Sequence, residues 1–229
     1  MNSLTTCVIS QSNYIPWKGY FQMIAKSDIF VFYDNVSFTS RDWRSRNKIL
    51  TKSGELWLTI PVGSNRGKNI DEVDLPNGKW KTKHLESIKR AYSKFPYYED
   101  VKEILEPIFF ERGLDNLSLF NQKLIKSFCK YLEIDTKFYN AADLGIDGNR
   151  VEKLIKICEK LGADTYISGP AAKNYIKNEF DDSGITLQWM EYGPFEEYEQ
   201  NGSEFSHYVS IIDTIARLGK DSIEHICIS

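Results

Sequence analysis

The chain of 229 residues is 41% hydrophobic and 27% charged, which is the composition of a globular protein that can bury a full core. Its 29 basic and 32 acidic residues give a formal charge of −3 at pH 7. This near balance excludes a global positive field, so we expect no general nucleic-acid binding and no attraction to anionic membranes.

The first third of the chain predicts a β-α-β unit. Residues 6–10 and 29–34 are short apolar runs rich in β-branched or aromatic residues. Residues 19–27 between them are long enough for a helix. A third apolar run at 55–62 is followed by a polar, glycine-containing loop.

The middle third predicts three helices. A hydrophobic period of 3.6 marks an amphipathic helix that starts at Trp80 and ends at the Pro96 turn. Two further helices are expected over residues 98–109, interrupted by Pro107, and over residues 117–132. These segments form a helical insertion over about residues 80–132.

The final third returns to alternating strands and helices. A helix is expected over residues 151–161, between strands expected in the segments 137–145 and 165–170. Residues 185–190 are expected to add an edge strand, and residues 205–218 a closing helix. The order of elements predicts a single-domain α/β protein over residues 1–229, a Rossmann-like three-layer sandwich with a mostly parallel sheet.

The cysteines and apolar runs limit the location and chemistry of the protein. None of the four cysteines belongs to a CxxC pair, and no charged segment leads into an apolar one at the start, so we expect a reducing cytoplasm. No apolar run approaches the roughly 18 residues that a membrane span needs. With only three scattered histidines, the sequence supplies no zinc-ligand spacing, and we expect neither a metal nor a cofactor.

The turn after the first strand is the first candidate binding site. In α/β folds ligands bind beyond the carboxyl ends of the strands, most often at this turn. Pro16 delays the start of the helix, and Gly19 would let a ligand approach the helix entrance. Four side chains offer hydrogen bonds and stacking faces there: Gln11, Asn13, Tyr14 and Tyr20. The alternative is that the aromatic residues only cover the edge of the sheet.

A basic segment with an aromatic residue follows the second strand. Asp34 ends that strand, and four residues shortly after it are candidates for binding a diphosphate and stacking on a base: Trp43, Arg44, Arg46 and Asn47. The alternative is a solvated basic loop that pairs with acidic residues elsewhere.

His84 is the best candidate for a general base if it points into the cleft, since His207 and His225 lack a comparable setting. It shares the apolar stripe of its helix, so a buried histidine bonded to a backbone carbonyl is the alternative. Ser168 and Gly169 end a later strand and could contact a ligand at the same sheet edge, although an ordinary turn explains them equally well.

Taken together, the spaced motifs resemble the WbqC-like protein family over about residues 6–220. The residues that carry the resemblance are Gln11, Tyr14, Pro16-Trp17 and Gly19-Tyr20-Phe21, followed by FVFYDNVSF, RDWRSRNKI, WKTKHL, AYSKFPYY, YISGP and SIIDTIARLGK. The family typically reads Gln-Pro at the opening, where this chain has Gln11-Ser12, so the turn is expected to be less rigid here.

The resemblance implies a protein encoded with O-antigen and other surface-polysaccharide genes, whose relatives have been suggested to be glycine transferases that acylate an amino sugar. The implied partners are a nucleotide-linked amino sugar and an activated acyl or glycyl donor, for which a carrier protein, coenzyme A and tRNA all fit. In such a reaction His84 would accept the proton of the attacking amine, and Asp34 would orient the sugar or the histidine. Ser168 or backbone amides would stabilise the oxyanion.

Two other functions fit the same residues. The segment WKGY at 17–20 stands where nucleotidyltransferases of the HxGH type carry two histidines, so an enzyme that activates an amino acid or a sugar is one alternative. A non-catalytic binding protein of polysaccharide assembly is the other. A homodimer is compatible with all three.

Overall fold

The computed structural model describes residues 4–201 and 204–227, and its centre is a five-stranded parallel sheet. The strands are β1 (Thr6–Ser10), β2 (Ile29–Phe32), β5 (Lys137–Asn140), β6 (Thr165–Ser168) and β7 (Thr186–Trp189). They lie in the order β5-β2-β1-β6-β7, with every neighbouring pair parallel. Counted along the chain, this order is that of doubly wound Rossmann-type sheets, and the predicted α/β class is confirmed.

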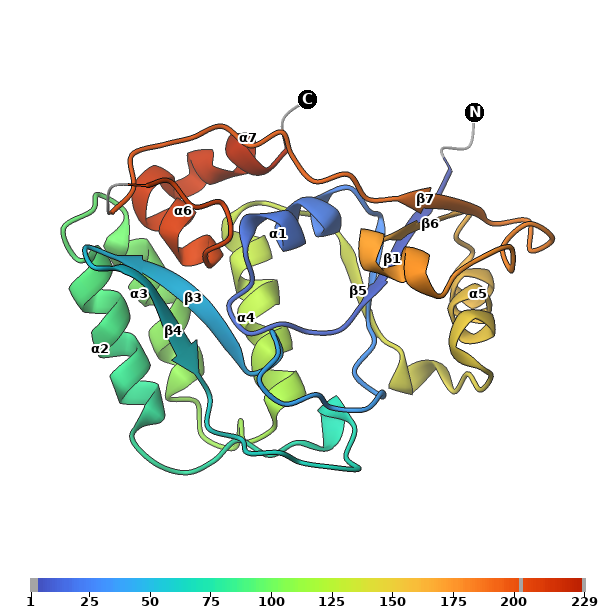
Figure 1. The fold of residues 1–229 in the computed structure, drawn as a ribbon, viewed down its shortest axis with the longest axis horizontal. Helices are drawn as coiled ribbons and strands as arrows, with labels where there is room; N and C mark the ends of the chain where they lie inside the picture. Colours follow the sequence, from blue (N-terminus) through green and yellow to red (C-terminus); the bar gives the residue numbers. More distant parts are fainter. Residues whose placement is uncertain (1–3, 202–203, 228–229) are drawn as a thin grey trace.

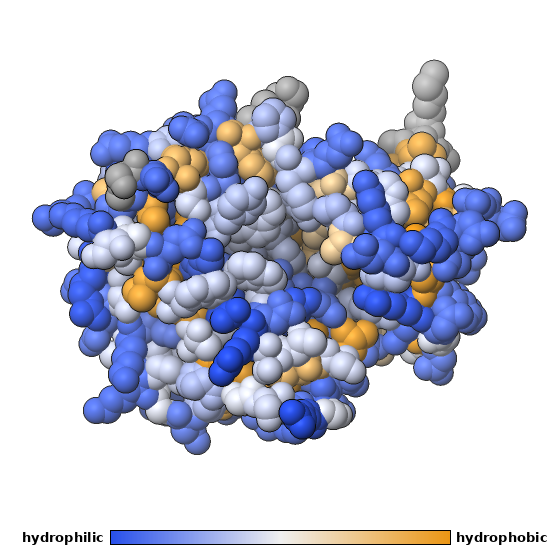
Figure 2. All heavy atoms as spheres, viewed as in Figure 1, coloured by the Kyte–Doolittle hydropathy of each residue, from blue (hydrophilic) through white to orange (hydrophobic). Residues whose placement is uncertain are grey.

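The two faces of the sheet carry separate hydrophobic cores, so the protein has three layers (Figure 1). Side chains alternate along β1, and Val8 lies in one core while Cys7 lies in the other. The helices α1 (Lys18–Ala25) and α4 (Leu117–Tyr131) contribute to the first core, and α5 (Arg150–Leu161) contributes to the second. On the face seen in Figure 2, hydrophobic residues form separate patches between hydrophilic ones.

The segment between β2 and β5 extends the first core with a hairpin and helices. A two-stranded antiparallel sheet, β3 (Arg46–Thr51) and β4 (Gly54–Thr59), packs with α2 (Trp80–Tyr92) and α3 (Tyr98–Phe109). The apolar run at 55–62 therefore builds a separate hairpin and does not join the central sheet. The second half of the basic segment is a strand and not the solvated loop that the sequence left as an alternative, because it pairs with β4 and buries Ile49 in the first core.

The predicted helices are present, with two corrections. α3 continues through Pro107, which has no N–H to donate to the carbonyl of Glu103, and the helix ends two residues later at Phe109. The closing helix α6 (Ile211–Leu218) starts later than expected and is followed by α7 (Ser222–Ile226). Residues 205–210 precede it as irregular chain with a turn at residues 207–208. Short 3-10 turns complete the structure at Ile70–Glu72, Ala142–Leu144, Pro170–Asn174 and Gly219–Asp221.

The late start of α6 follows from contacts of the preceding chain. Ser210 N donates to Lys48 O at 2.8 Å, and Ile211 N donates to Pro16 O at 2.7 Å. Ser206 Oγ also donates to the Glu55 carboxylate at 3.0 Å. These bonds tie the segment to β3, β4 and the turn after β1, and they bring the C-terminal part of the chain to the predicted binding turn.

Candidate functional site

The turn between β1 and α1 has a strained backbone that a buried amide supports. Ile15 adopts a φ of 38°, which is unfavourable for a β-branched residue. Asn47 of β3 is buried, and its Nδ2 donates to Tyr14 O at 3.1 Å and to Ile15 O at 2.9 Å. Its Oδ1 accepts from Lys48 N at 2.8 Å. Asn47, predicted to contact a ligand, therefore uses its side chain to shape the turn.

Beside this turn lies a cavity of about 240 Å³ that we call the aromatic cavity. Its lining consists of Asn13, Pro16, Trp17, Trp43, Asn47 and Tyr208. Trp43 and Tyr208 are 42% and 66% exposed, so two of the rings are available to a ligand. Asn13 brings an amide, whose buried Oδ1 has no hydrogen-bond partner within residues 4–201 and 204–227. The sequence-predicted Asn13, Pro16 and Trp43 thus converge from two separate segments.

Gly19 serves the tryptophan and not a ligand. A Cβ at this position would lie 2.3 Å from Cζ2 of Trp17, because the indole ring folds back over the glycine. The same ring packs between the rings of Tyr192 and Tyr208, with centroid distances of 5.2 and 5.5 Å. The sequence predicted that a ligand could approach the helix entrance at Gly19. Trp17 fills this space, and its indole ring forms one wall of the aromatic cavity.

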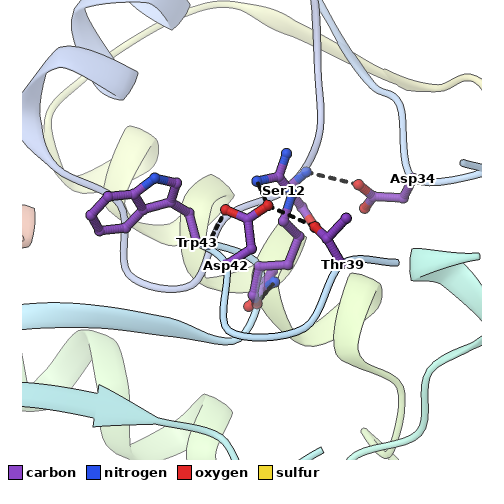
Figure 3. Close-up of polar contacts among 7 residues, drawn as sticks. Ser12, Asp34, Thr39, Asp42 and Trp43 are labelled. Atoms are coloured by element: carbon purple, nitrogen blue, oxygen red, sulfur yellow. Dashed lines mark hydrogen bonds and ion pairs between the residues drawn. The ribbon is translucent and has the colours of Figure 1, made fainter. Parts of the chain in front are cut away.

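Asp34 is held in a hydrogen-bond network at the carboxyl end of β2. Its Oδ1 accepts from Ser12 N at 2.8 Å, which ties it to the turn after β1 (Figure 3). Its Oδ2 accepts from Ser118 Oγ at 2.5 Å and from Gln122 Nε2 at 3.5 Å. Asp34 is 3% exposed and lines a second cavity of about 260 Å³, which we call the Asp34 cavity.

The arginines of the basic segment are engaged with neighbours. Arg44 pairs with Asp42 at 2.9 Å, and Asp42 also accepts from Thr39 Oγ and from Trp43 N (Figure 3). Arg46 stacks on the indole of Trp57, with its guanidinium carbon 4.2 Å from the ring centroid. Neither arginine lines the aromatic cavity, so the diphosphate contacts expected of them remain a prediction.

His84 lies in an apolar setting, away from both cavities. Its ring packs against Trp80 and Tyr14, at centroid distances of 5.3 and 5.7 Å, and the residue is 7% exposed. Nδ1 lies 2.8 Å from Tyr14 Oη, and the other ring nitrogen bonds to the carbonyl of Thr59. Burial lowers the pKa of His84 to about 4. These are the surroundings of a neutral structural histidine, and they do not support a role as general base.

The remaining predicted residues lie at the sheet edge without lining either cavity. Tyr20 is 3% exposed and donates its hydroxyl to Gln11 O at 2.9 Å. Ser168 is 3% exposed, and its carbonyl accepts from Met190 N. A Cβ at Gly169 would lie 3.7 Å from Tyr192 Oη, so the turn after β6 contacts the chain that follows β7. These positions shape the edge of the sheet.

Lys18 is a feature that the sequence did not reveal. It is 1% exposed at the first position of α1, and its Nζ lies 4.9 to 5.3 Å from the ring centroids of Phe195, Tyr198 and Phe205. In the described part of the chain Nζ has no hydrogen-bond partner. Burial lowers the pKa of Lys18 to about 8, against the opposing charge of Asp213. Nothing in the sequence distinguishes this lysine from an exposed one.

Two further residues of the site escaped the sequence analysis. Trp17 belonged to a recognised stretch, but only its packing over Gly19 shows that it is a cavity wall. Tyr208 was assigned to a helix, but it lies in a turn, and it reaches the cavity because Ser210, two residues later, pairs with Trp17. The sequence could have indicated Tyr208 as a cavity residue only if this pairing had been known.

The parallel sheet, its strand order and the aromatic cavity at the first turn define a doubly wound α/β protein with a candidate binding site beside its first crossover. The model of the WbqC-like protein family matches residues 11–225. The chain belongs to the WbqC-like protein family.

A curated relative supports this assignment along the whole chain. The Mycobacterium tuberculosis (strain ATCC 25618 / H37Rv) protein named Uncharacterized protein Rv1507c is 35% identical over 222 residues. The match covers 95% of this chain and 96% of that protein. As for membranes, none of the helices in residues 4–201 and 204–227 has both the length and the apolar composition of a span.

Proposed function

We propose that this protein is an acyl- or aminoacyltransferase that acts on a nucleotide-linked amino sugar in surface-polysaccharide biosynthesis. The family supplies the polysaccharide context, and the aromatic cavity supports the substrate class. We place the acceptor there, with a sugar or base ring against Trp43 and Tyr208. A glycyl group is the donor that the family favours.

The aromatic cavity is the observation that carries this proposal. Two exposed rings and a third ring behind them give flat apolar faces, and Asn13 places a polar group among them. Such a combination suits the ring of a nucleobase or a sugar, which needs stacking area and few directed hydrogen bonds. Stacking of a base on an aromatic side chain contributes about 1–3 kcal/mol.

The proposed reaction no longer needs His84. An ammonium must lose its proton before it can attack an acyl carbonyl, and the group that accepts the proton must reach the amine. Both nitrogens of His84 are already bonded, and its lowered pKa makes it a weak base. We infer that the proton is accepted outside the α2 helix, either at the cavities or by solvent.

Mass spectrometry of the products tests the proposal. Purified protein is incubated with dTDP- and UDP-linked amino sugars and with glycyl or acetyl donors on coenzyme A, on a carrier protein or on tRNA. A mass gain equal to the acyl group is the expected result, and Trp43→Ala should lower the rate at least tenfold. Tyr139→Ala removes an exposed ring on β5 that is 39% exposed and should leave the rate unchanged.

A non-catalytic binding protein is the second candidate, and one observation favours it. Among the described residues, the lining of the aromatic cavity includes no carboxylate, lysine, arginine or histidine, so it offers recognition groups but no group that exchanges a proton near neutral pH. On this alternative, nucleotide sugars raise the melting temperature of the protein. A ligand at a concentration 100 times its dissociation constant should stabilise the folded state by about 2.7 kcal/mol. No acyl transfer then occurs with any donor, which would refute the transferase proposal.

A further inference from the structure

The Asp34 cavity lies at the carboxyl ends of β2 and β5 and has a lining unlike that of the aromatic cavity. Polar side chains and the last residues of these two strands surround it: Phe32, Asp34, Asn35, Asp71, Asn116, Ser118, Leu119, Gln122, Asn140, Ala142 and Asp143. The edge where parallel strands end is the usual ligand position in this fold. The hydrogen-bond donors and acceptors of its lining residues therefore determine which ligand it could bind.

The side-chain donors that the structure places around this cavity are largely consumed by bonds within the protein. Ser118 Oγ and Gln122 Nε2 donate to Asp34, and Gln122 Nε2 also donates to Ser118 Oγ at 3.0 Å. Asn116 Nδ2 donates to Asp71 O at 2.8 Å. Asn140 Nδ2 donates to the Asp143 carboxylate at 3.0 Å. A ligand in this cavity therefore meets few donors.

Several hydrogen-bond acceptors of the cavity, in contrast, have no donor within the described residues. Gln122 is 6% exposed and lines the cavity, and within the described residues its Oε1 accepts no hydrogen bond. The orientation of this amide is determined by its neighbours, because Ser118 donates to Asp34 and must accept from the Gln122 NH₂ group. The buried Oδ1 atoms of Asn35 and Asn140 also have no partner in the part of the chain that the structure describes.

The charged side chains that line the cavity in the described chain are all acidic. Asp34, Asp71 and Asp143 line it, and among its described lining residues there is no lysine, arginine or histidine. Burial and the nearby charges of Asp34 and Glu72 raise the pKa of Asp71, and the charge of Lys153, which does not line the cavity, opposes this rise. Among the described residues, no group of three or more histidine, cysteine, aspartate or glutamate side chains is placed to hold a metal ion.

We propose that the Asp34 cavity binds the primary ammonium group of a small polar ligand, with Gln122 Oε1 and the Asp71 carboxylate as its acceptors. An ammonium has three N–H donors and a positive charge, which match the unused acceptors and the carboxylates. Amino sugars and amino-acid esters or amides both carry such a group. The site binds an amine whether or not the aromatic cavity belongs to a transferase, so the two proposals fail independently.

Titration with paired ligands tests the proposal by NMR of the ¹⁵N-labelled protein. Glucosamine is compared with glucose, and glycinamide with glycolamide, so each pair differs only in the amine. Saturable shifts of the Gln122 side-chain amide are expected with an amine and not with its hydroxyl analogue. A response to glucosamine alone identifies a sugar amine, a response to glycinamide alone an aminoacyl amine, and a response to both an ammonium recognised by itself.

Charge-neutral variants locate the site. Asp71→Asn keeps the shape of the side chain and should weaken amine binding at least tenfold, and Gln122→Met should do the same. Asp74→Asn is the matched control, because its carboxylate is 81% exposed and lies outside the cavity, and it should change binding less than twofold. Equal binding of glucose and glucosamine, no response to either amine, or unchanged affinity in a folded Asp71→Asn variant would overturn the proposal.

Discussion

His84 makes the stability of this fold depend on pH. The neutral ring is bonded to Tyr14 and Thr59 and packed against aromatic side chains, so protonation would place an unpaired charge in an apolar setting. Burial lowers its pKa from 6.5 to about 4. Because the folded state binds this proton less readily than the unfolded chain, stability is full above pH 6.5 and falls as the pH drops toward 4.

The size of this effect follows from the shift in pKa. A difference of about 2.5 units corresponds to about 3 kcal/mol over the full range, and about 2 kcal/mol of that is lost by pH 5. For a domain whose total stability is about 5–15 kcal/mol, a loss of this size is easily measured.

Urea unfolding of the wild type and of His84→Gln at pH 7.5 and pH 5 provides the assay. Glutamine has one donor and one acceptor group but does not titrate, so the variant should lose about 2 kcal/mol less than the wild type between these pH values. His207→Gln is a useful comparison, because His207 is partly exposed and its pKa is lowered by burial and by Lys18. Parallel losses in the wild type and His84→Gln would show that His84 is not the buried neutral group described here.

Three further changes probe the turn after β1 and its surroundings. Asn47→Ala leaves two carbonyls of the strained turn unbonded and should cost about 2–4 kcal/mol in urea unfolding, whereas a loss below about 1 kcal/mol would contradict this role. Gly19→Ala should displace Trp17 and alter tryptophan fluorescence, while Gly169→Ala, whose Cβ would have its nearest neighbour at 3.7 Å, should leave the spectrum unchanged. Lys18→Met should raise stability at pH 7 by about 2 kcal/mol, because it removes a buried ammonium without a bonded partner. The folded pKa of Lys18, about 8, lies below that of the unfolded chain, so wild-type stability should rise between pH 8 and pH 10.5 relative to Lys18→Met, and equal pH profiles would refute the assignment.

Local patterns in the sequence were sufficient for most of the central architecture. The strands β2 and β6 are buried along their whole length and are rich in β-branched and aromatic residues, and α2 shows a regular stripe because only one of its faces is covered. These signals are set by residues close in the sequence. They predicted the parallel sheet, its crossovers and the position of the helical insertion.

The pairing of β3 was not predictable in the same way. Its residues include Arg46, Asn47 and Lys48, which resemble a basic loop, and only the antiparallel partner β4 and the burial of Ile49 make the segment a strand. The late start of α6 likewise depends on contacts with distant parts of the chain. The hydrogen bonds of Ser210 and Ile211 go to Lys48 and Pro16, more than 160 residues earlier, and no local pattern records them.

The candidate site was likewise predictable in part from the sequence, and in part decided only by the tertiary structure. The sequence by itself located the turn after β1 and supplied Asn13, Pro16 and Trp43, because ligand positions in a doubly wound sheet follow from its topology. Only the tertiary structure decided that Trp17 fills the space over Gly19 and that Tyr208 completes the cavity.

The tertiary structure alone also decided which polar groups are free to act. His84 is bonded to the hydroxyl of Tyr14 and Asn47 to the carbonyls of the turn after β1, while Gln122 keeps an unused acceptor in a cavity. The physical reason is that the availability of a polar atom depends on its partners. Those partners are brought together by packing between distant parts of the chain, which a residue's sequence neighbours do not specify.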